Sequence, residues 1–246
     1  NGLWDTRQKE LFAHWAGDER RNITPRQLAR MTSGLRWTED YGTISQATVM
    51  LYQADSMGRF TARQPPEAKP GEHWEYSSGS TNLLAYLLQS DLPGSGNLFL
   101  EKGFKEPLGL EKLLIEPDAA GFWVGSSYAY ATAREWGRMG QLLLQKGRWG
   151  GDTLFTSSWY DFMTAPAPQA QQGYGAGLWL NADGHLEGVP QEVFYMDGYH
   201  GQRVFVLPAQ DMVVVRLGTT YEPDKLQFAR RLRELLKIKD ELRASS

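Results

Sequence analysis

The segment DGYHGQRVFVLPAQDMVVVRLG, residues 197–218, contains two short apolar runs separated by turn residues. The runs QRVFVLP and MVVVRLG are rich in β-branched and aromatic residues, which favour strands. The intervening PAQD is short enough for a tight turn, so the two runs are expected to pair as an antiparallel hairpin. Two similar runs, GYGAGLWLN and EVFYMDGY, precede the segment, starting at about residue 172. We therefore expect a C-terminal antiparallel sheet.

Helical patterns both precede and follow the predicted sheet along the sequence. Thr24 with Gln27, and Thr132 with Glu135, have the spacing of a capping box and so predict two helix starts. A third helix is expected from Ser78 onward. The end of the chain, over residues 223–243, predicts an amphipathic helix that covers one face of the sheet, with these residues at helical spacing: Phe228, Leu232, Leu235 and Leu236.

The order of these elements indicates the fold class. A mostly helical region over residues 1–171 is followed by a sheet and its covering helix over residues 172–246. That order is typical of an α+β protein, and the chain is long enough for a sizeable core. We expect the two regions to form one domain overall.

Composition excludes several classes of partner. The net charge is −3, and basic residues are interleaved with acidic ones, which argues against a nucleic-acid partner. No apolar stretch approaches the roughly 20 residues that cross a bilayer. The chain has no cysteine, which excludes disulfides and thiolate chemistry and fits the periplasm and the cytosol almost equally, with the periplasm slightly favoured.

Cofactor and metal motifs are also missing from the sequence. None of the four histidines, His14, His73, His185 and His200, is paired at a metal-ligand spacing, so no metal site is expected. The GYGAG at 173–177 opens a strand rather than a helix, which argues against a dinucleotide site. There is no GxSxG nucleophile elbow. We expect no cofactor.

Two residues stand where chemistry is plausible. In GEHWEYSSGSTNLLAYLL, residues 71–88, Tyr76 directly precedes a helix N-terminus, whose positive end could lower the pKa of a phenol enough for it to act as a base. His200 and Gly201 stand at a strand start, where the backbone could approach a substrate closely. On these features alone, a packing role for Tyr76 and a structural role for His200 stay open.

Five segments, taken in order, resemble the serine β-lactamase and penicillin-binding-protein superfamily. They are ITPRQLARMTSGLRWTEDY, GEHWEYSSGSTNLLAYLL, EPLGL, GFWVGSSYAYATAREWGRMGQLLLQKGRWGG and GYHGQRVFVLPAQDMVVVRLG. The branch they resemble most is the class C-like group of esterases, D-aminopeptidases and 6-aminohexanoate-dimer hydrolases, and the likeness covers about residues 20–220. The resemblance implies a β-lactamase-like α+β fold. It also implies acyl transfer from an ester or amide through a serine acyl-enzyme.

The resemblance also implies site residues. The family uses a Ser-x-x-Lys, a Tyr-x-Asn-type motif and a Lys-Thr-Gly-type strand. Tyr76-Ser77-Ser78 matches the second motif with Ser78 in place of Asn, and His200-Gly201 matches the third with His in place of Lys, which argues against penicillin as the natural substrate. The implied catalytic residues are Tyr76 and His200, and the implied substrate contacts are Tyr41, Ser78, Gly201 and Gln202.

Tyr41 is included among the implied substrate contacts because it ends the WTEDY stretch. In the aminohexanoate-dimer hydrolases a tyrosine after such a stretch closes over the substrate, so Tyr41 is expected to contact the substrate amide. A packing or loop-surface role stays open. The neighbouring carboxylates Glu39 and Asp40 are adjacent residues on a turn, and we expect them to diverge into solvent.

No Ser-x-x-Lys occurs in the 246 residues. In the relatives the nucleophile helix precedes the ITPRQLARMTSG segment, so we expect it, together with the first strands of the fold, upstream of Asn1. On this reading the parent protein is a serine hydrolase, its partner is a small-molecule or short-peptide ester or amide, and the chain alone is inactive unless an N-terminal fragment of the same protein joins it. The alternative is a non-catalytic relative that binds peptidoglycan or peptides, or an inactive C-terminal fragment. The sequence leaves the substrate open among esters, linear amides, D-amino-acid peptides and β-lactams.

Overall fold

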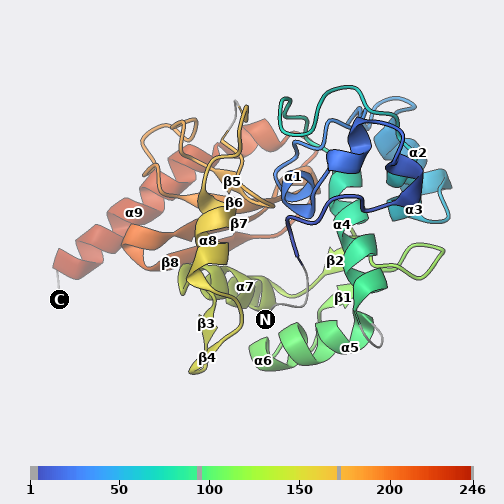
Figure 1. The fold of residues 1–246 in the computed structure, drawn as a ribbon. Helices are drawn as coiled ribbons and strands as arrows, with labels where there is room; N and C mark the ends of the chain where they lie inside the picture. Colours follow the sequence, from blue (N-terminus) through green and yellow to red (C-terminus); the bar gives the residue numbers. More distant parts are fainter. Residues whose placement is uncertain (1–4, 93–95, 171–172, 245–246) are drawn as a thin grey trace. The chain divides into compact units, whose positions relative to one another are not determined.

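The computed structural model of the chain describes residues 5–92, 96–170 and 173–244 (Figure 1). It divides into two compact units. Unit 1 comprises Asn1–Glu135 with Ala167–Ala170, and unit 2 comprises Trp136–Pro166 with Gln171–Ser246. The division of the chain at residue 171 that the sequence suggests stays a prediction.

Unit 1 is built around the helix α4 (Ser78–Asp91), which packs against α1, α2 and α3. Its other elements, in chain order, are η1 (Ala13–Trp15), η2 (Glu19–Asn22), α1 (Pro25–Ala29), α2 (Gln46–Gln53), α3 (Met57–Ala62), α5 (Gly96–Leu100), η3 (Glu101–Lys105), α6 (Glu106–Leu108), and the antiparallel strands β1 (Leu114–Ile115) and β2 (Ala129–Tyr130). The helix expected from Ser78 onward is confirmed.

The core of unit 1 consists of two clusters of buried side chains. One contains Trp15, Ile23, Leu28, Leu35, Ala62, Leu83 and Leu87. The other contains Trp37, Ala47, Met50, Met57 and Val124. The first turn of α4 lies very close to the second cluster, because a Cβ added at Gly79 would stand 2.5 Å from the Trp37 ring. A glycine at that position therefore lets the indole pack directly on the helix N-terminus.

Unit 2 holds the antiparallel sheet in the order β5-β6-β7-β8 (Figure 1). Its elements are α7 (Ala133–Leu144), whose first turn belongs to unit 1, the hairpin of β3 (Arg148–Trp149) and β4 (Asp152–Thr153), α8 (Ser157–Thr164), β5 (Trp179–Leu180), β6 (Phe194–Gly198), η4 (Tyr199–Gly201), β7 (Gln202–Leu207), η5 (Pro208–Gln210), β8 (Met212–Arg216), η6 (Pro223–Leu226) and α9 (Phe228–Ala244). The expected sheet and its covering helix are present, and the α+β class is confirmed.

Side chains alternate between the two faces of this sheet, as the strand period of two requires. Phe194 and Val206 are cross-strand partners and pack with Leu143 of α7 and Tyr160 of α8. Their chain neighbours Tyr195 and Phe205 belong to the opposite cluster, which includes Leu232 of α9. The sheet is therefore covered by α7 and α8 on one face and by α9 on the other.

Three expected elements have different bounds, and positive backbone angles explain each difference. The last helix begins at Phe228 rather than near residue 223, because Gln227 has φ 48° and interrupts the turns before it. In the run GYGAGLWLN only Trp179–Leu180 forms a strand, since Gly173 and Gly177 have φ 63° and 75°. The helix that starts with the capping box of Thr24 ends at Ala29, and Met31 follows with φ 60°.

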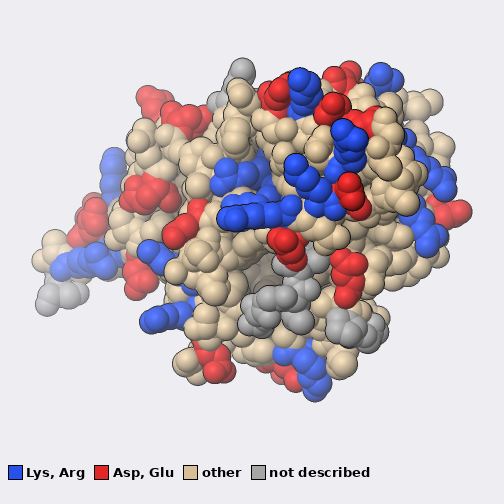
Figure 2. Space-filling model, in the orientation of Figure 1, with Lys and Arg blue, Asp and Glu red and all other residues tan. Residues whose placement is uncertain are grey.

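The distribution of charged side chains and the length of the helices bear on the expectations from composition. Side chains of both signs of charge occur across the face shown in Figure 2. Among the described residues, no helix is both long enough and apolar enough to span a bilayer.

Candidate active site

One group of candidate residues, in unit 1, lies at the N-terminus of α4. Ser77 is the N-cap, and its hydroxyl accepts a hydrogen bond from the Ser80 N–H at 3.0 Å, which satisfies one of the free donors of the helix. Tyr76 stands in the extended segment directly before the cap and is half-buried. Its backbone therefore leads directly into the N-terminus of a helix of 14 residues.

A carboxylate holds this helix end. Glu39 Oε2 accepts from the Ser78 N–H and the Ser78 hydroxyl, both at 3.0 Å, and from Trp37 Nε1 at 2.5 Å. Its other oxygen, Oε1, accepts from the Tyr41 hydroxyl at 2.5 Å. The expectation of a solvated Glu39 was therefore wrong, because the N-terminal N–H groups of α4 attract its negative charge. Asp40 is exposed, as expected, and accepts from the Gly42 N–H at 2.8 Å.

Tyr41 takes part in this network as a neutral hydrogen-bond donor. Partial burial of the phenol, although Tyr41 remains 43% exposed, together with its hydrogen bond to Glu39 and the negative charge of Glu39, raises its pKa above the ordinary value of 10.0. The electrostatic influence of Tyr76 acts in the same direction, whereas a hydrogen bond with Ser78 opposes it. The structure thus brings together Tyr41, Tyr76 and Ser78, three of the residues expected from the sequence.

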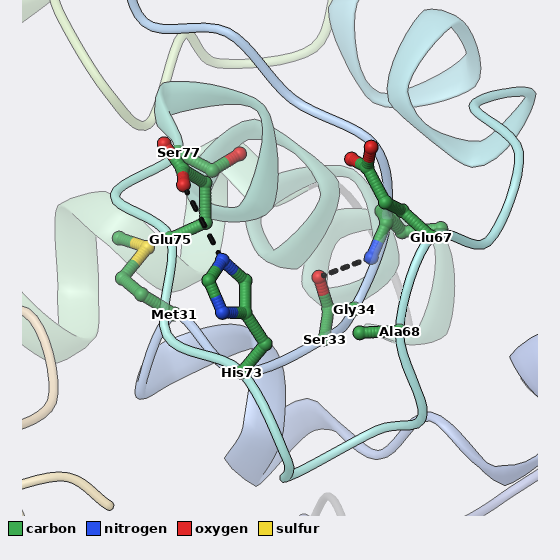
Figure 3. A pocket seen from close by; sticks show the side chains of 9 residues that line it. Met31, Ser33, Gly34, Glu67, Ala68, His73, Glu75 and Ser77 are labelled. Carbon is green, nitrogen blue, oxygen red and sulfur yellow. Dashed lines mark hydrogen bonds and ion pairs between the residues drawn. The ribbon is translucent and has the colours of Figure 1, made fainter. Parts of the chain in front are cut away.

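A small cavity is lined in part by His73, Glu75 and Ser77, which flank Tyr76 in the chain (Figure 3). It measures about 20 Å³ and is lined by Met31, Ser33, Gly34, Leu35, Glu67, Ala68, His73, Glu75 and Ser77. The His73 ring faces Glu75, with Nε2 3.5 Å from the carboxylate (Figure 3). A volume of this size holds about one water molecule. The cavity is therefore too small to be a substrate site.

Another group of candidate residues, in unit 2, lies at the turn between β6 and β7. Tyr199–Gly201 forms a 3-10 turn in which His200 adopts the left-handed conformation, with φ 57° and ψ 31°. The His200 ring lies against Tyr199 at a centroid distance of 3.9 Å and meets the Tyr221 ring at 4.9 Å. Both tyrosines are largely exposed, at 69% and 83%. The histidine therefore belongs to an exposed aromatic group rather than to the core.

Gly201 is required at this turn for two reasons. Its φ is 85°, a conformation that other residues rarely adopt. A Cβ at this position would also lie 2.7 Å from Leu226 Cδ1 and 3.1 Å from Arg216 Nη1. Gln202 follows as the first residue of β7, and its side-chain amide exchanges two hydrogen bonds of 2.8 Å with the backbone of Gly218.

The expected site residues fall into two groups. Tyr41, Tyr76 and Ser78 lie in unit 1, and His200, Gly201 and Gln202 lie in unit 2. Sequence reasoning missed two residues that hydrogen-bond densely to these groups, Glu39 and Arg216. Glu39 had only its place in WTEDY as a signal, and Arg216 only its place as a charged residue at the end of the apolar run MVVVR. Within the ranges that the structure describes, no cluster of three His, Asp or Glu side chains could hold a metal ion.

The sequence profile of the family described as Beta-lactamase matches residues 9–237. The chain belongs to the Beta-lactamase family. This assignment confirms the resemblance read from the five segments, and it identifies the chain as a member of a hydrolase family. No curated protein sequence matches this β-lactamase-family chain.

Solved structures show the same β-lactamase-like fold. A protein from Bacillus anthracis assigned as a 6-aminohexanoate-dimer hydrolase superposes with a TM-score of 0.80 at 20% identity, over 97% of this chain and 68% of that one. A penicillin-binding protein homologue from Caulobacter crescentus gives 0.68 at 18% identity, over 89% and 72% of the two chains. A D-stereospecific amidohydrolase from Streptomyces sp. gives 0.52 at 20% identity, over 84% and 68%.

Proposed function

We propose that the chain is the larger, C-terminal part of a serine hydrolase that cleaves an ester or amide through an acyl-enzyme. The observation that carries the proposal is the placement of Tyr76 at the N-terminus of α4, with Tyr41 and Ser78 gathered there by Glu39. A tyrosine at a helix N-terminus, among hydrogen-bonded neighbours, suits proton transfer. The family assignment supports a hydrolase.

The nucleophile is proposed to be the serine of a Ser-x-x-Lys upstream of Asn1. None of the serines in the chain is followed by lysine at that spacing. The superposition with the Bacillus anthracis protein covers 68% of that protein.

The proposed reaction has two steps. The serine oxygen attacks the carbonyl carbon and forms an acyl–oxygen bond, while its proton passes through the lysine and Tyr76 to the departing alcohol or amine. Water then adds to the acyl carbon, the acyl–serine bond breaks, and a proton from the water passes to the serine oxygen, which releases the acid. The backbone N–H of Gln202 is proposed to donate to the oxyanion in both steps.

The other residues are proposed to contact the substrate. Tyr41 and Ser78 are the contacts proposed in unit 1, and Gly201 and Gln202 are those proposed in unit 2. His200 takes the position where relatives carry lysine, and a histidine supplies no permanent positive charge at neutral pH. A neutral ester or a linear amide therefore suits this site better than a substrate that needs a fixed cation for its carboxylate.

The proposal is tested by a Tyr76→Phe substitution in the longer protein, assayed with an activated ester such as a p-nitrophenyl acylate. Loss of proton transfer should lower kcat by about 10²- to 10⁴-fold. Tyr52→Phe is the matched control, because Tyr52 is 73% exposed and should keep full activity. Equal turnover by Tyr76→Phe and the wild type would contradict the proposal.

A further inference from the structure

Three aromatic rings meet at the turn between β6 and β7. The Tyr199 and His200 ring centroids lie 3.9 Å apart, with an angle of 30° between the ring planes. Tyr221, in the segment between β8 and η6, meets the His200 ring at 4.9 Å and 64°. Tyr199 is 69% exposed and Tyr221 is 83% exposed, so both phenols are mostly in contact with solvent.

Hydrogen bonds hold the two backbone segments that carry these rings together. The Thr220 N–H donates to the His200 carbonyl at 3.0 Å, so the residue before Tyr221 is tied to the backbone of the histidine. Arg216 adds a second link, because its Nη1 donates to the His200 carbonyl at 3.3 Å and to the Gly201 carbonyl at 2.9 Å. Its Nη2 donates to Thr220 Oγ1 at 2.5 Å. The exposed rings are therefore anchored by the backbone beneath them.

Charged side chains beside this group in the sequence already have partners. Glu222, which follows Tyr221, is paired with Lys225 at 2.5 Å. Asp197 of β6 is paired with Arg203 of β7. A charged group of a ligand would have to compete with these pairs, whereas a neutral planar group needs only the faces and edges of the rings.

Anchored and exposed aromatic rings suit a planar apolar ligand. An aromatic ring that stacks on a phenol, or meets its edge, gains contacts between the two π-systems in addition to the area that it buries. Rings that are already held in place lose little freedom on binding, so more of this gain appears as affinity. The tyrosine hydroxyl can stay in water while the ring binds, which makes tyrosine a common contact residue.

We propose that Tyr199 and Tyr221 form a specificity subsite, beside His200, for an aromatic ring of the substrate. The inference rests on the proposed function, in which the substrate contacts the His200 turn, and it narrows the substrate to an ester or amide that carries such a ring. A ring in the acyl part and a ring in the leaving group would use the same stacking contacts. Because these contacts involve a part of the substrate that does not react, their loss raises KM more than it lowers kcat.

The test is steady-state kinetics of the longer protein on three esters, with titration of the released acid at constant pH. Vinyl butyrate has no aromatic ring, vinyl benzoate has one in the acyl part, and phenyl butyrate has one in the leaving group. Tyr221→Ala should lower kcat/KM about 3- to 20-fold, mainly through KM, for the ester whose ring occupies the subsite. It should leave vinyl butyrate unchanged. Tyr199→Ala should act in the same way, whereas Tyr221→Phe keeps the ring and should retain the wild-type KM.

Tyr52→Ala is the matched control, because Tyr52 is exposed to a similar extent, at 73%, and lies in unit 1; it should behave as wild type on all three esters. Three results would each overturn the inference and leave the hydrolase proposal standing. They are an equal effect of Tyr221→Ala on esters with and without a ring, no effect on any ester, and a Tyr221→Phe variant as impaired as Tyr221→Ala. A wild-type protein that turns over none of the esters would overturn both proposals.

Discussion

The Glu39 side chain accepts hydrogen bonds from several donors at the N-terminus of α4. Its carboxylate accepts from Trp37, Tyr41 and Ser78 and faces the N-terminus of α4. Each donor would lose its partner if the carboxylate were removed, and an unsatisfied buried donor destabilises the fold. The residue therefore serves stability and the orientation of Tyr41 together.

Glu39→Gln tests this role. The amide keeps one acceptor oxygen, but its NH₂ group cannot accept the bonds that Oε2 receives, so the free energy of unfolding should fall by about 1–3 kcal/mol. Urea unfolding of the purified protein measures it. Glu67→Gln is the control, because the Glu67 side chain is 60% exposed and stands 4.0 Å from Arg36. Equal stability of the Glu39 variant and wild type would show that the network does not stabilise the helix end.

The raised pKa of Tyr195 predicts how the free energy of unfolding changes at alkaline pH. Burial, together with the charge of Asp197, raises the pKa of this phenol from 10.0 to about 12. The folded protein thus holds the proton more tightly than the unfolded chain, so the contribution is full below pH 10 and is lost as pH rises through 12. It amounts to about 2–3 kcal/mol.

Chemical unfolding between pH 9 and 12 measures this effect. The free energy of unfolding should fall with rising pH, and Tyr195→Phe should flatten the decline. Tyr130→Phe provides the control, because Tyr130 is 51% exposed. The same slope in the Tyr195 variant and the wild type would contradict the assignment.

At the scale of elements, glycines decide how α7 packs on the sheet. A Cβ at Gly140 would stand 2.6 Å from Val213 Cγ1 and 3.0 Å from Val204 Cγ1, and both valines are stiff β-branched residues of the adjacent strands β8 and β7. A Cβ at Gly137, one turn earlier, would meet nothing closer than Val215 at 3.8 Å.

The two positions therefore predict opposite effects of one substitution. Gly140→Ala should destabilise the protein by about 1–3 kcal/mol through overpacking. Gly137→Ala should be neutral or should stabilise it by up to about 1 kcal/mol, because alanine favours the helix. Thermal unfolding of the pair measures both, and a Gly140 variant as stable as the Gly137 variant would show that α7 does not pack closely on β7 and β8.

Capped and periodic elements were predictable from the sequence, and elements ended by unusual backbone angles were not. The capping box of Thr132 and Glu135 is present, with hydrogen bonds of 2.9 and 3.2 Å, because its geometry depends only on local spacing. The ends of the last helix and of the GYGAGLWLN run depend on residues such as Gln227, whose positive φ no local pattern revealed. Such angles are set by tertiary packing rather than by propensity.

At the scale of the whole molecule, the candidate site also divides into residues that local sequence motifs predict and residues whose contacts are distant in sequence. Tyr76 and His200 are predicted as site residues because they stand in motifs of the family, and the sheet, the covering helix and the fold class followed from pattern. Glu39 and Arg216 could not, because each acts through contacts that are distant in sequence: Glu39 is 39 residues from Ser78, and Arg216 is 15 residues from Gly201. In a single sequence, Glu39 and Arg216 are visible only as isolated charged residues, without any sign of their distant partners.

The proposed distribution of catalytic groups predicts the behaviour of the chain by itself. Residues 1–246 without an upstream segment should not hydrolyse an activated ester above the rate of their own Tyr76→Phe variant, because the nucleophile is proposed to lie outside them. The longer protein should show turnover. Stopped assays of both proteins at equal concentration measure this, and Tyr76-dependent turnover by the 246-residue chain would contradict an upstream nucleophile.

The proposed nucleophile can be identified by mass spectrometry of the longer protein after brief exposure to a slowly hydrolysed activated ester or a fluorophosphonate. We expect one covalent adduct per chain, located by peptide mapping on the serine of a Ser-x-x-Lys upstream of Asn1. We also expect Tyr76→Phe to slow adduct formation strongly. An unmodified protein, or an adduct on a residue outside such a motif, would rule out the proposed acyl-enzyme.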